Sequence, residues 1–168
     1  MSDAETRNVL FAGLGGQGVL VVSGITALAA FRTGYDVKQS EVHGMAQRGG
    51  SVTSHVRFGR KVRSPLIPQG AADFLVAIHE KESTRCRSQI RPGGIVIDPS
   101  LPGAADELCN KWGNLYLLGI LSGHLPFDRE AWRQAIRSVV PQKFLELNLA
   151  AFDRGAASVS QSNGDIAS

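Results

Sequence analysis

Four glycines fall within six residues near the start of the chain, in the stretch 13–18, which we call the glycine turn. An apolar run over residues 8–12 precedes it, and the apolar segment 19–31 follows it. A strand that reverses into a helix within so few residues needs backbone angles that glycine adopts at little cost. The stretch therefore predicts a strand, a tight turn and a helix, as at the start of a Rossmann-like α/β domain.

The glycine turn also has the spacing of a phosphate-binding site. Gly13, Gly15 and Gly18 fit the pattern G-x-G-x-x-G, with Gly16 and Gln17 between the last two. In dinucleotide-binding folds the second glycine lets a pyrophosphate approach the backbone, whereas the first and third serve the turn and the helix packing. Backbone N–H groups at the helix start would favour an anion. Two readings stay open: a site for a phosphate, or a purely structural turn.

The remaining pattern predicts one three-layer α/β domain over residues 1–155, with a mixed, mostly parallel sheet and a helical C-terminal part. Further strands are expected at residues 35–39, 72–78 and 95–98, and a β-hairpin is expected from 51–58 with 61–63. Helices are expected over residues 114–125, after Asp128, and from Pro141 to a stop at Gly155. Residues 156–168 are predicted to be a disordered tail.

The charge pattern limits the classes of partner. Net charge is only +3, but no acidic residue lies between Glu41 and Asp73, a stretch that holds five basic ones: Arg48, Arg57, Arg60, Lys61 and Arg63. Without interleaved aromatic residues, such a face fits solvent, an acidic ligand or an acidic protein surface better than nucleic acid. No apolar run approaches the roughly 20 residues that span a bilayer, and the first residues lack the apolar core of a secretory signal. We expect a cytoplasmic protein with no membrane span and no nucleic-acid partner.

The two cysteines, Cys86 and Cys109, are far apart and form no Cys-x-x-Cys pattern. Neither has other cysteines or histidines at metal-ligand spacing. We therefore expect no metal site and no iron–sulfur cluster held by this chain alone.

A second polar stretch, residues 41–51, is the other candidate for function, and we call it the interface segment. Polar, glycine-flanked connections are where binding residues tend to lie. Glu41 also lies where a nicotinamide-dinucleotide fold offers an acid to the ribose. The candidate residues of the interface segment are Glu41, His43, Gly44, Gln47, Arg48, Gly49, Gly50 and Ser51.

Taken together, residues 13–18 and 40–52 closely resemble the gamma subunit, or gamma-type domain, of 2-oxoacid:ferredoxin oxidoreductases. The indolepyruvate, aryl-pyruvate and phenylglyoxylate branches look nearest, and the resemblance continues through residues 72–78, 91–98 and 143–152. It implies an enzyme complex that decarboxylates a 2-oxoacid on thiamine diphosphate with magnesium. Electrons then pass through iron–sulfur clusters to ferredoxin or another acceptor, and the acyl group usually goes to coenzyme A.

The resemblance also implies how the work is divided. Thiamine diphosphate and the clusters would belong to alpha and beta catalytic subunits and a ferredoxin-like subunit, so this chain would carry no catalytic residue. The interface segment would face a partner's active site, and the glycine turn would meet a coenzyme A phosphate, a solvent anion or an acidic group of a partner. Members of the family have a longer segment in place of residues 99–113, so we expect the sheet to lack one edge strand. The alternatives are a stand-alone dinucleotide-binding oxidoreductase and a scaffold without a ligand.

Overall fold

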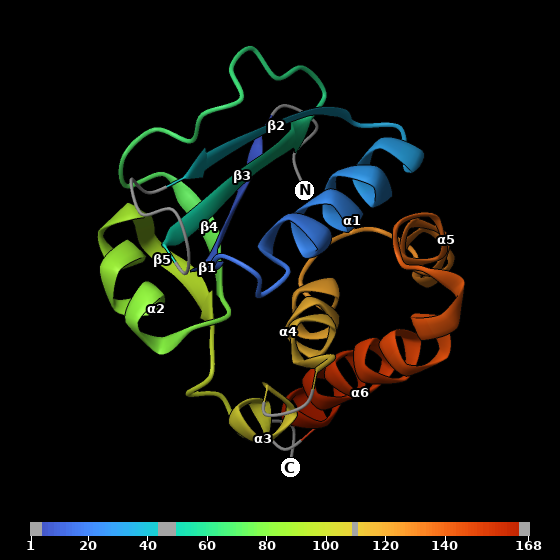
Figure 1. The fold of residues 1–168 in the computed structure, drawn as a ribbon. Coiled ribbons are helices and arrows are strands. Elements are labelled where there is room, and N and C mark those ends of the chain that lie inside the picture. Colours follow the sequence, from blue (N-terminus) through green and yellow to red (C-terminus); the bar gives the residue numbers. More distant parts are fainter. Residues whose placement is uncertain (1–4, 44–49, 109–110, 165–168) are drawn as a thin grey trace.

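The computed structural model describes residues 5–43, 50–108 and 111–164 of the 168-residue chain (Figure 1). Its elements, in chain order, are β1 (Arg7–Leu14), α1 (Val19–Arg32), β2 (Asp36–His43), β3 (Ser51–Gly59), β4 (Ala72–Ala77), α2 (Glu80–Cys86), η1 (Arg87–Gln89), β5 (Ile90–Ile97), α3 (Ala104–Leu108), α4 (Gly113–Ser122), α5 (Arg129–Val139), η2 (Gln142–Phe144) and α6 (Leu145–Gly164). Among these described residues, no helix combines the length and the apolar character that a membrane crossing requires.

The five strands form one sheet in the order β2-β3-β1-β4-β5. β3 runs antiparallel to both of its neighbours, while β1, β4 and β5 pair in parallel. Because β1 and β2 are both antiparallel to β3, every strand except β3 points the same way. The predicted α/β class with a mixed, mostly parallel sheet is confirmed.

The hairpin differs from the prediction. It joins β2 to β3, with His43 opposite Val52, and residues 60–63 form no strand. Both edges of β3 are already occupied by β1 and β2, so no edge is left for residues 61–63. Val62 instead donates its backbone N–H to Asp36 Oδ2 at 2.7 Å. β2 consequently lies two strands away from β1, and not beside it as in a Rossmann βαβ unit.

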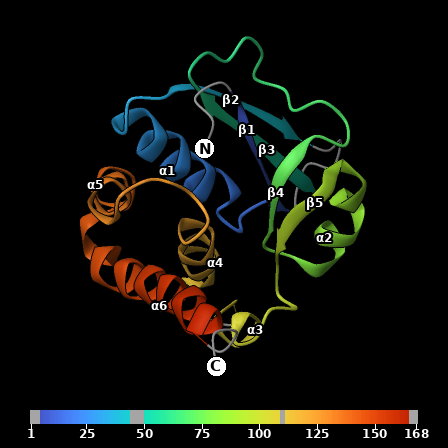
Figure 2. The same ribbon diagram turned by 180° about the vertical axis from the view of Figure 1, so that it is seen from behind.

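Helices cover both faces of the sheet, as Figure 1 and the reverse view in Figure 2 show. α2 covers one face, and α1 lies on the other with α4, α5 and α6 beyond it. Val9 and Phe11 of β1 belong to the larger core on the α1 face, whereas Leu10 and Ala12 belong to the smaller core on the α2 face. All four side chains are fully buried. A strand buried on both faces reads as a continuous apolar run, which explains the pattern over residues 8–12.

The C-terminal helices correct a second prediction. α6 does not stop at Gly155 but continues to Gly164, so residues 156–164 are helical and not a disordered tail. Gly155 lies against α4, where an added Cβ would overlap the carbonyl oxygen of Tyr116. A Cβ added at Gly119 of α4 would likewise overlap the carbonyl oxygen of Phe152 in α6. These two glycines let the helices approach closely, and neither is a helix stop.

Two smaller features bear on the predicted pattern. β5 begins at Ile90 and takes in the predicted turn at 91–94, with a register shift between Ala72 and Phe74 that accommodates it. Asp128 caps α5 as predicted, since its Oδ1 accepts from the N–H of Ala131 at 2.7 Å.

His55 of β3 is buried and makes the stability of the fold depend on pH. Its Nδ1 accepts from the backbone N–H of Ile67 at 3.1 Å. Burial, and then the nearby charge of Arg57, lower the pKa of His55 below its ordinary value of 6.5, so the folded protein holds the ring neutral. Burial lowers the pKa of His124 in the same direction.

We expect the free energy of unfolding to fall as the pH drops below about 6.5, because the unfolded chain then binds more protons than the folded one. One such histidine gives a slope of up to about 1.4 kcal/mol per pH unit. Urea unfolding between pH 5 and 8 measures this slope. His55→Asn keeps an acceptor near the Nδ1 position but does not titrate, so it should flatten the dependence of the unfolding free energy on pH. An unchanged slope would show that other groups cause the dependence.

Candidate functional site

The glycine turn forms the predicted strand, turn and helix. β1 ends at Leu14 and α1 begins at Val19, and Gly16 and Gly18 have φ angles of 88° and 80°. Such angles favour glycine. Gly13 lies within β1, where an added Cβ would stand 2.7 Å from Val19 Cγ2. The first glycine therefore serves the close packing of the helix start on the strand.

Some of the donors that would cradle a phosphate are used within the chain. Gln17 Oε1 accepts from the N–H of Leu14 at 2.7 Å, and the N–H of Gly15 donates to Gly50 O at 2.9 Å. Gly18 has a packing role as well, because an added Cβ would overlap Nδ2 of Asn114 at the start of α4. Fewer backbone N–H groups of this turn are therefore free to bind a pyrophosphate than in an open phosphate-binding loop.

The start of α1 nevertheless suits a negative charge. Gly18 is its N-cap and provides no side-chain hydrogen bond, and the first turn has no acidic residue. Backbone N–H groups at an uncapped helix start, together with the helix dipole, favour an anion.

A hollow of about 250 Å³ adjoins this helix start and is bounded by cationic and aromatic side chains. The ammonium group of Lys111 lies 5.2 Å from the ring centroid of Trp112 and 4.7 Å from that of Phe144. The Lys143 ammonium lies 4.8 Å from the Phe144 ring centroid. We call Lys111, Trp112, Lys143 and Phe144 the lysine–aromatic cluster. The sequence analysis missed it, although the two Lys–aromatic dipeptides 111–112 and 143–144 were a visible signal.

A second hollow, of about 380 Å³, lies on the other side of the glycine turn. Its lining includes Gly15, Gly16 and Gly18 together with His43 of β2 and the exposed side chain of Leu20. The structure thus brings one residue of the interface segment, His43, to the glycine turn.

The other predicted residues of the interface segment have different positions. Glu41 is exposed on edge strand β2, and its Oε2 lies 3.7 Å from His43 Nε2. Neighbouring strands are roughly 5 Å apart, so β2 lies about 10 Å from β1. An acid that binds the ribose in a dinucleotide-binding fold is expected on the strand next to β1, and Glu41 is not there. Gly44, Gln47, Arg48 and Gly49 lie outside the described residues.

Gly50 and Ser51 are held by the rest of the domain. Gly50 accepts from Gly15, as noted, and Ser51 Oγ donates to Glu82 Oε1 of α2 at 2.7 Å. Arg85 Nε and NH2 donate to Glu82 Oε2 at 2.9 and 2.6 Å. Burial works to raise the pKa of Glu82, but the hydrogen bonds from Arg85 and Ser51 outweigh it and leave the pKa below its ordinary value. Glu82 is therefore an ionised, buried carboxylate at neutral pH.

The predicted basic face is only partly a surface feature. Arg57 is half-buried and lies along the domain surface, where Nε donates to Asn8 Oδ1 at 2.8 Å and NH1 donates to the carbonyl oxygens of Ser64 and Leu66. Arg60, Lys61 and Arg63 are exposed. Arg57 therefore serves the fold by joining β3 to the connection that follows it.

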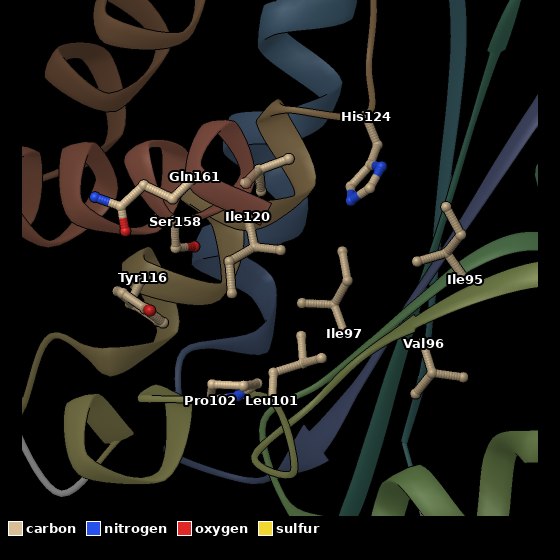
Figure 3. Close-up of a pocket in the computed structure, with 11 residues that line it drawn as sticks. Ile95, Val96, Ile97, Leu101, Pro102, Tyr116, Ile120, His124, Ser158 and Gln161 are labelled. Atoms are coloured by element: carbon tan, nitrogen blue, oxygen red, sulfur yellow. The ribbon is translucent and has the colours of Figure 1, made fainter. Parts of the chain in front are cut away.

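A larger hollow, of about 500 Å³, lies apart from the glycine turn, between β5 and the helices α4 and α6 (Figure 3). Ile95 and Ile97 of β5, with Leu101, form one wall, and Tyr116, Ile120 and Gln161 form the other. None of the residues that the sequence singled out lines it. β5 is an edge strand of the described sheet on this side.

The described ranges contain no group of three or more His, Cys, Asp or Glu side chains that could hold a metal ion. Cys86 is fully buried on the α2 face, and burial raises the pKa of its thiol. Its environment is that of a packed core residue.

The fold and the site together define an α/β domain in which an uncapped helix start adjoins His43 on one hollow and lysine and aromatic side chains on another. The family model for pyruvate ferredoxin/flavodoxin oxidoreductase matches residues 8–158, and the chain belongs to that family. It is a gamma-type subunit of a 2-oxoacid:ferredoxin oxidoreductase, and so one part of a multi-subunit enzyme.

The chain is similar in sequence and in structure to known subunits of such enzymes. The indolepyruvate oxidoreductase subunit IorB of Archaeoglobus fulgidus is 36% identical, in an alignment that includes 88% of this chain and 92% of that one. The gamma subunit of a keto/oxoacid ferredoxin oxidoreductase from Geobacter sulfurreducens has a similar structure, with a TM-score of 0.75 at 25% identity over 92% of this chain and 99% of that one. A 2-oxoglutarate:ferredoxin oxidoreductase from Magnetococcus marinus shares the fold, with a TM-score of 0.79 at 20% identity over 94% of this chain and 31% of that one.

The alignment with the Archaeoglobus subunit also shows a difference in length. It spans 187 positions, whereas 88% of this chain's 168 residues is about 148. About 40 positions of the alignment are therefore occupied in the Archaeoglobus subunit and are gaps in this chain. The short connection from β5 to α4, with the hollow of Figure 3 beside it, is where the sequence predicted such a shortening.

Proposed function

We propose that this chain is the accessory subunit of a complex that oxidatively decarboxylates a 2-oxoacid, to an acyl-CoA, on thiamine diphosphate held by partner subunits. The observation that carries the proposal is the family match over residues 8–158, together with the hollow in which His43 of the interface segment meets the glycine turn. In this proposal the partners are alpha and beta catalytic subunits and a ferredoxin-like iron–sulfur subunit, and the final acceptor is ferredoxin or a similar carrier.

The chain's own part is to shape one wall of the cleft that receives substrate and coenzyme A. The interface segment faces the partner's active site, and Arg48 pairs with a carboxylate or phosphate there as a planar fork. Similarity to indolepyruvate oxidoreductase subunits supports an aromatic 2-oxoacid as substrate. A comparison of kcat/KM for indolepyruvate and pyruvate in the purified complex tests that choice.

Coenzyme A phosphate is the anion that we assign to the start of α1. Uncapped N–H groups and the absence of acidic residues in the first turn of α1 support this. In the hollow beside it, Lys111 adds a cation, and Trp112 and Phe144 add two rings. Phosphate favours helix starts and ammonium groups, and an adenine ring can stack on aromatic faces. The Magnetococcus enzyme that shares the fold was solved with coenzyme A bound.

The alternative of a stand-alone dinucleotide-binding enzyme has weaker support. Glu41 stands two strands from β1, and the N–H groups of Leu14 and Gly15 are already used within the chain. Calorimetric titration with NAD and NADP should give no binding heat above dilution, and saturable binding would revive that alternative.

The decisive experiment compares the isolated chain with the reconstituted complex. We expect no 2-oxoacid-dependent dye reduction by the chain alone and full activity with its partner subunits. Arg48→Ala in the complex should lower kcat/KM by about 10- to 100-fold, the usual worth of a hydrogen bond to a charged group. Arg63→Ala, an exposed arginine of the same basic stretch, is the matched control and should change little. Activity of the isolated chain, or full activity of Arg48→Ala, would contradict the proposal.

A further inference from the structure

Two consecutive residues of α2 reach two different strands of the sheet. Glu82 Oε1 accepts from Ser51 Oγ at the first residue of β3, and Ser83 Oγ donates to Asp98 Oδ2 just after β5. Glu82 is 4% exposed and Ser83 is 2% exposed. α2 thus ties the start of β3 to the end of β5.

Further hydrogen bonds fix the two carboxylates, Glu82 and Asp98, through which α2 contacts these strands. Arg85 uses two donors on Glu82 Oε2, which leaves Oε1 for Ser51. Asp98 accepts from the N–H and the hydroxyl of Ser100 at 2.9 and 2.5 Å. A buried carboxylate is stable only when its oxygens are hydrogen-bonded, so the position of Glu82 depends on Arg85 and Ser51 together.

A second bond fixes the residue before Ser51. The N–H of Gly15 in the glycine turn donates to Gly50 O at 2.9 Å. Residues 50 and 51, where the interface segment enters β3, are therefore held from two sides, by the glycine turn and by α2. The Ser51–Glu82 bond can be removed by changing one side chain without disturbing the backbone, so it is the bond to test.

We propose that Glu82 is a positioning residue for the reaction of the complex, which acts by fixing Ser51 and with it the end of the interface segment. The inference rests on the proposed function, in which this segment faces the partner's active site. Glu82 does not touch substrate in this proposal. It sets the position of residues 50 and 51, so its effect belongs in kcat more than in the KM for the 2-oxoacid.

The test uses the complete complex with variants of Ser51, because Ser51→Ala removes one hydroxyl and leaves the Glu82–Arg85 pair in place. We expect kcat to fall about tenfold with a change of less than about twofold in KM, since one charge-assisted hydrogen bond is lost. Ser51→Thr keeps the hydroxyl and should recover most of kcat. Subunit assembly should match the unmodified complex in both variants, while the loss of one buried hydrogen bond should lower the thermal midpoint of Ser51→Ala by a few degrees. The amides of residues 51–53 should exchange faster with deuterium only in Ser51→Ala.

Glu82→Gln and the double variant complete the test. Glu82→Gln should also lower kcat, and adding Ser51→Ala to it should lower kcat little further, because both changes act through one bond. Glu80→Gln, at the exposed first residue of α2, is the matched control and should leave kcat unchanged.

Three results would overturn the inference. Full kcat in Ser51→Ala while Arg48→Ala is impaired would refute the role of Glu82 and leave the proposed function standing. Full activity in both would refute the proposed function and the inference with it. Failure of Ser51→Thr to recover kcat would assign the effect to packing and not to the hydroxyl.

Discussion

Gly155→Ala should lower the free energy of unfolding by about 3 kcal/mol, at the upper end of the usual range for overpacking a well-packed contact. The added Cβ would overlap the carbonyl group of Tyr116 in α4, and backbone atoms cannot rotate away as a side chain can. α4 and α6 must then separate, which opens the core around the fully buried side chains of Leu117 and Phe152. Urea unfolding, followed by the fluorescence of buried Trp132, measures the loss.

Gly24→Ala is the matched control for that variant. Gly24 also lies inside a helix, α1, but an added Cβ would have no heavy atom within 4 Å. Alanine should stabilise this position by about 0.5–1 kcal/mol, because glycine loses more backbone entropy in a helix. If Gly155→Ala unfolded at the same urea concentration as the unmodified chain, the close crossing of α4 and α6 would be refuted.

Lys111→Glu should raise the KM for coenzyme A by at least about tenfold in the complete complex. The change replaces a cation beside the start of α1 with an anion, and like charges repel a phosphate as strongly as opposite charges attract it. The ammonium of Lys111 also lies over two rings, so the variant loses both cation–π contacts. Initial rates against coenzyme A concentration, at low and at physiological ionic strength, measure the effect, which should shrink as salt screens the charges.

Lys81→Glu provides the control for this charge reversal. Lys81 is exposed on α2, on the opposite face of the sheet from the lysine–aromatic cluster. Its substitution by Glu changes the net charge of the protein by the same amount as Lys111→Glu. It should leave the KM for coenzyme A within about twofold. Equal effects of the two variants would indicate a response to overall charge, and no effect of Lys111→Glu would place the phosphate elsewhere.

Local signals predicted those parts of the fold that depend on neighbouring residues. The apolar run over residues 8–12, the glycine turn and the cap at Asp128 each act within a few residues, and the structure confirms all three. A hairpin is present, but its predicted pairing was wrong, because β3 pairs with β2 and β1 and its nearest paired residues, His43 and Val52, are nine positions apart. No local pattern reports which strand edge is free. Gly155 was misread for the same reason: a glycine after an apolar stripe usually stops a helix, and only the packing of α4 explains why this one does not.

The candidate site divides in the same way. The glycine turn was recognisable because its residues are contiguous, and the structure adds that Gly13 and Gly18 are required for packing. The lysine–aromatic cluster escaped notice because its two halves are about 30 residues apart in the chain and meet only where the start of α4 faces the start of α6. Glu82 has no local sequence signal for its role, because its burial and its hydrogen bond involve Ser51, from a different strand.

The position of β1 has a consequence for how the nascent chain folds. β1 is the central strand, yet both of its ladder partners follow it in the chain: Leu14 pairs with Ser51, and Val9 pairs with Phe74. At about 5–20 residues per second, synthesis of the intervening stretch before Ser51 takes about 2–7 s. Throughout that interval β1, which the folded domain buries on both faces, has unpaired backbone groups on both edges. Of the described elements, α1 is the helix already synthesised that can cover its apolar side chains. We therefore expect early formation of α1 to shield the apolar side chains of β1 and to limit aggregation of the growing polypeptide.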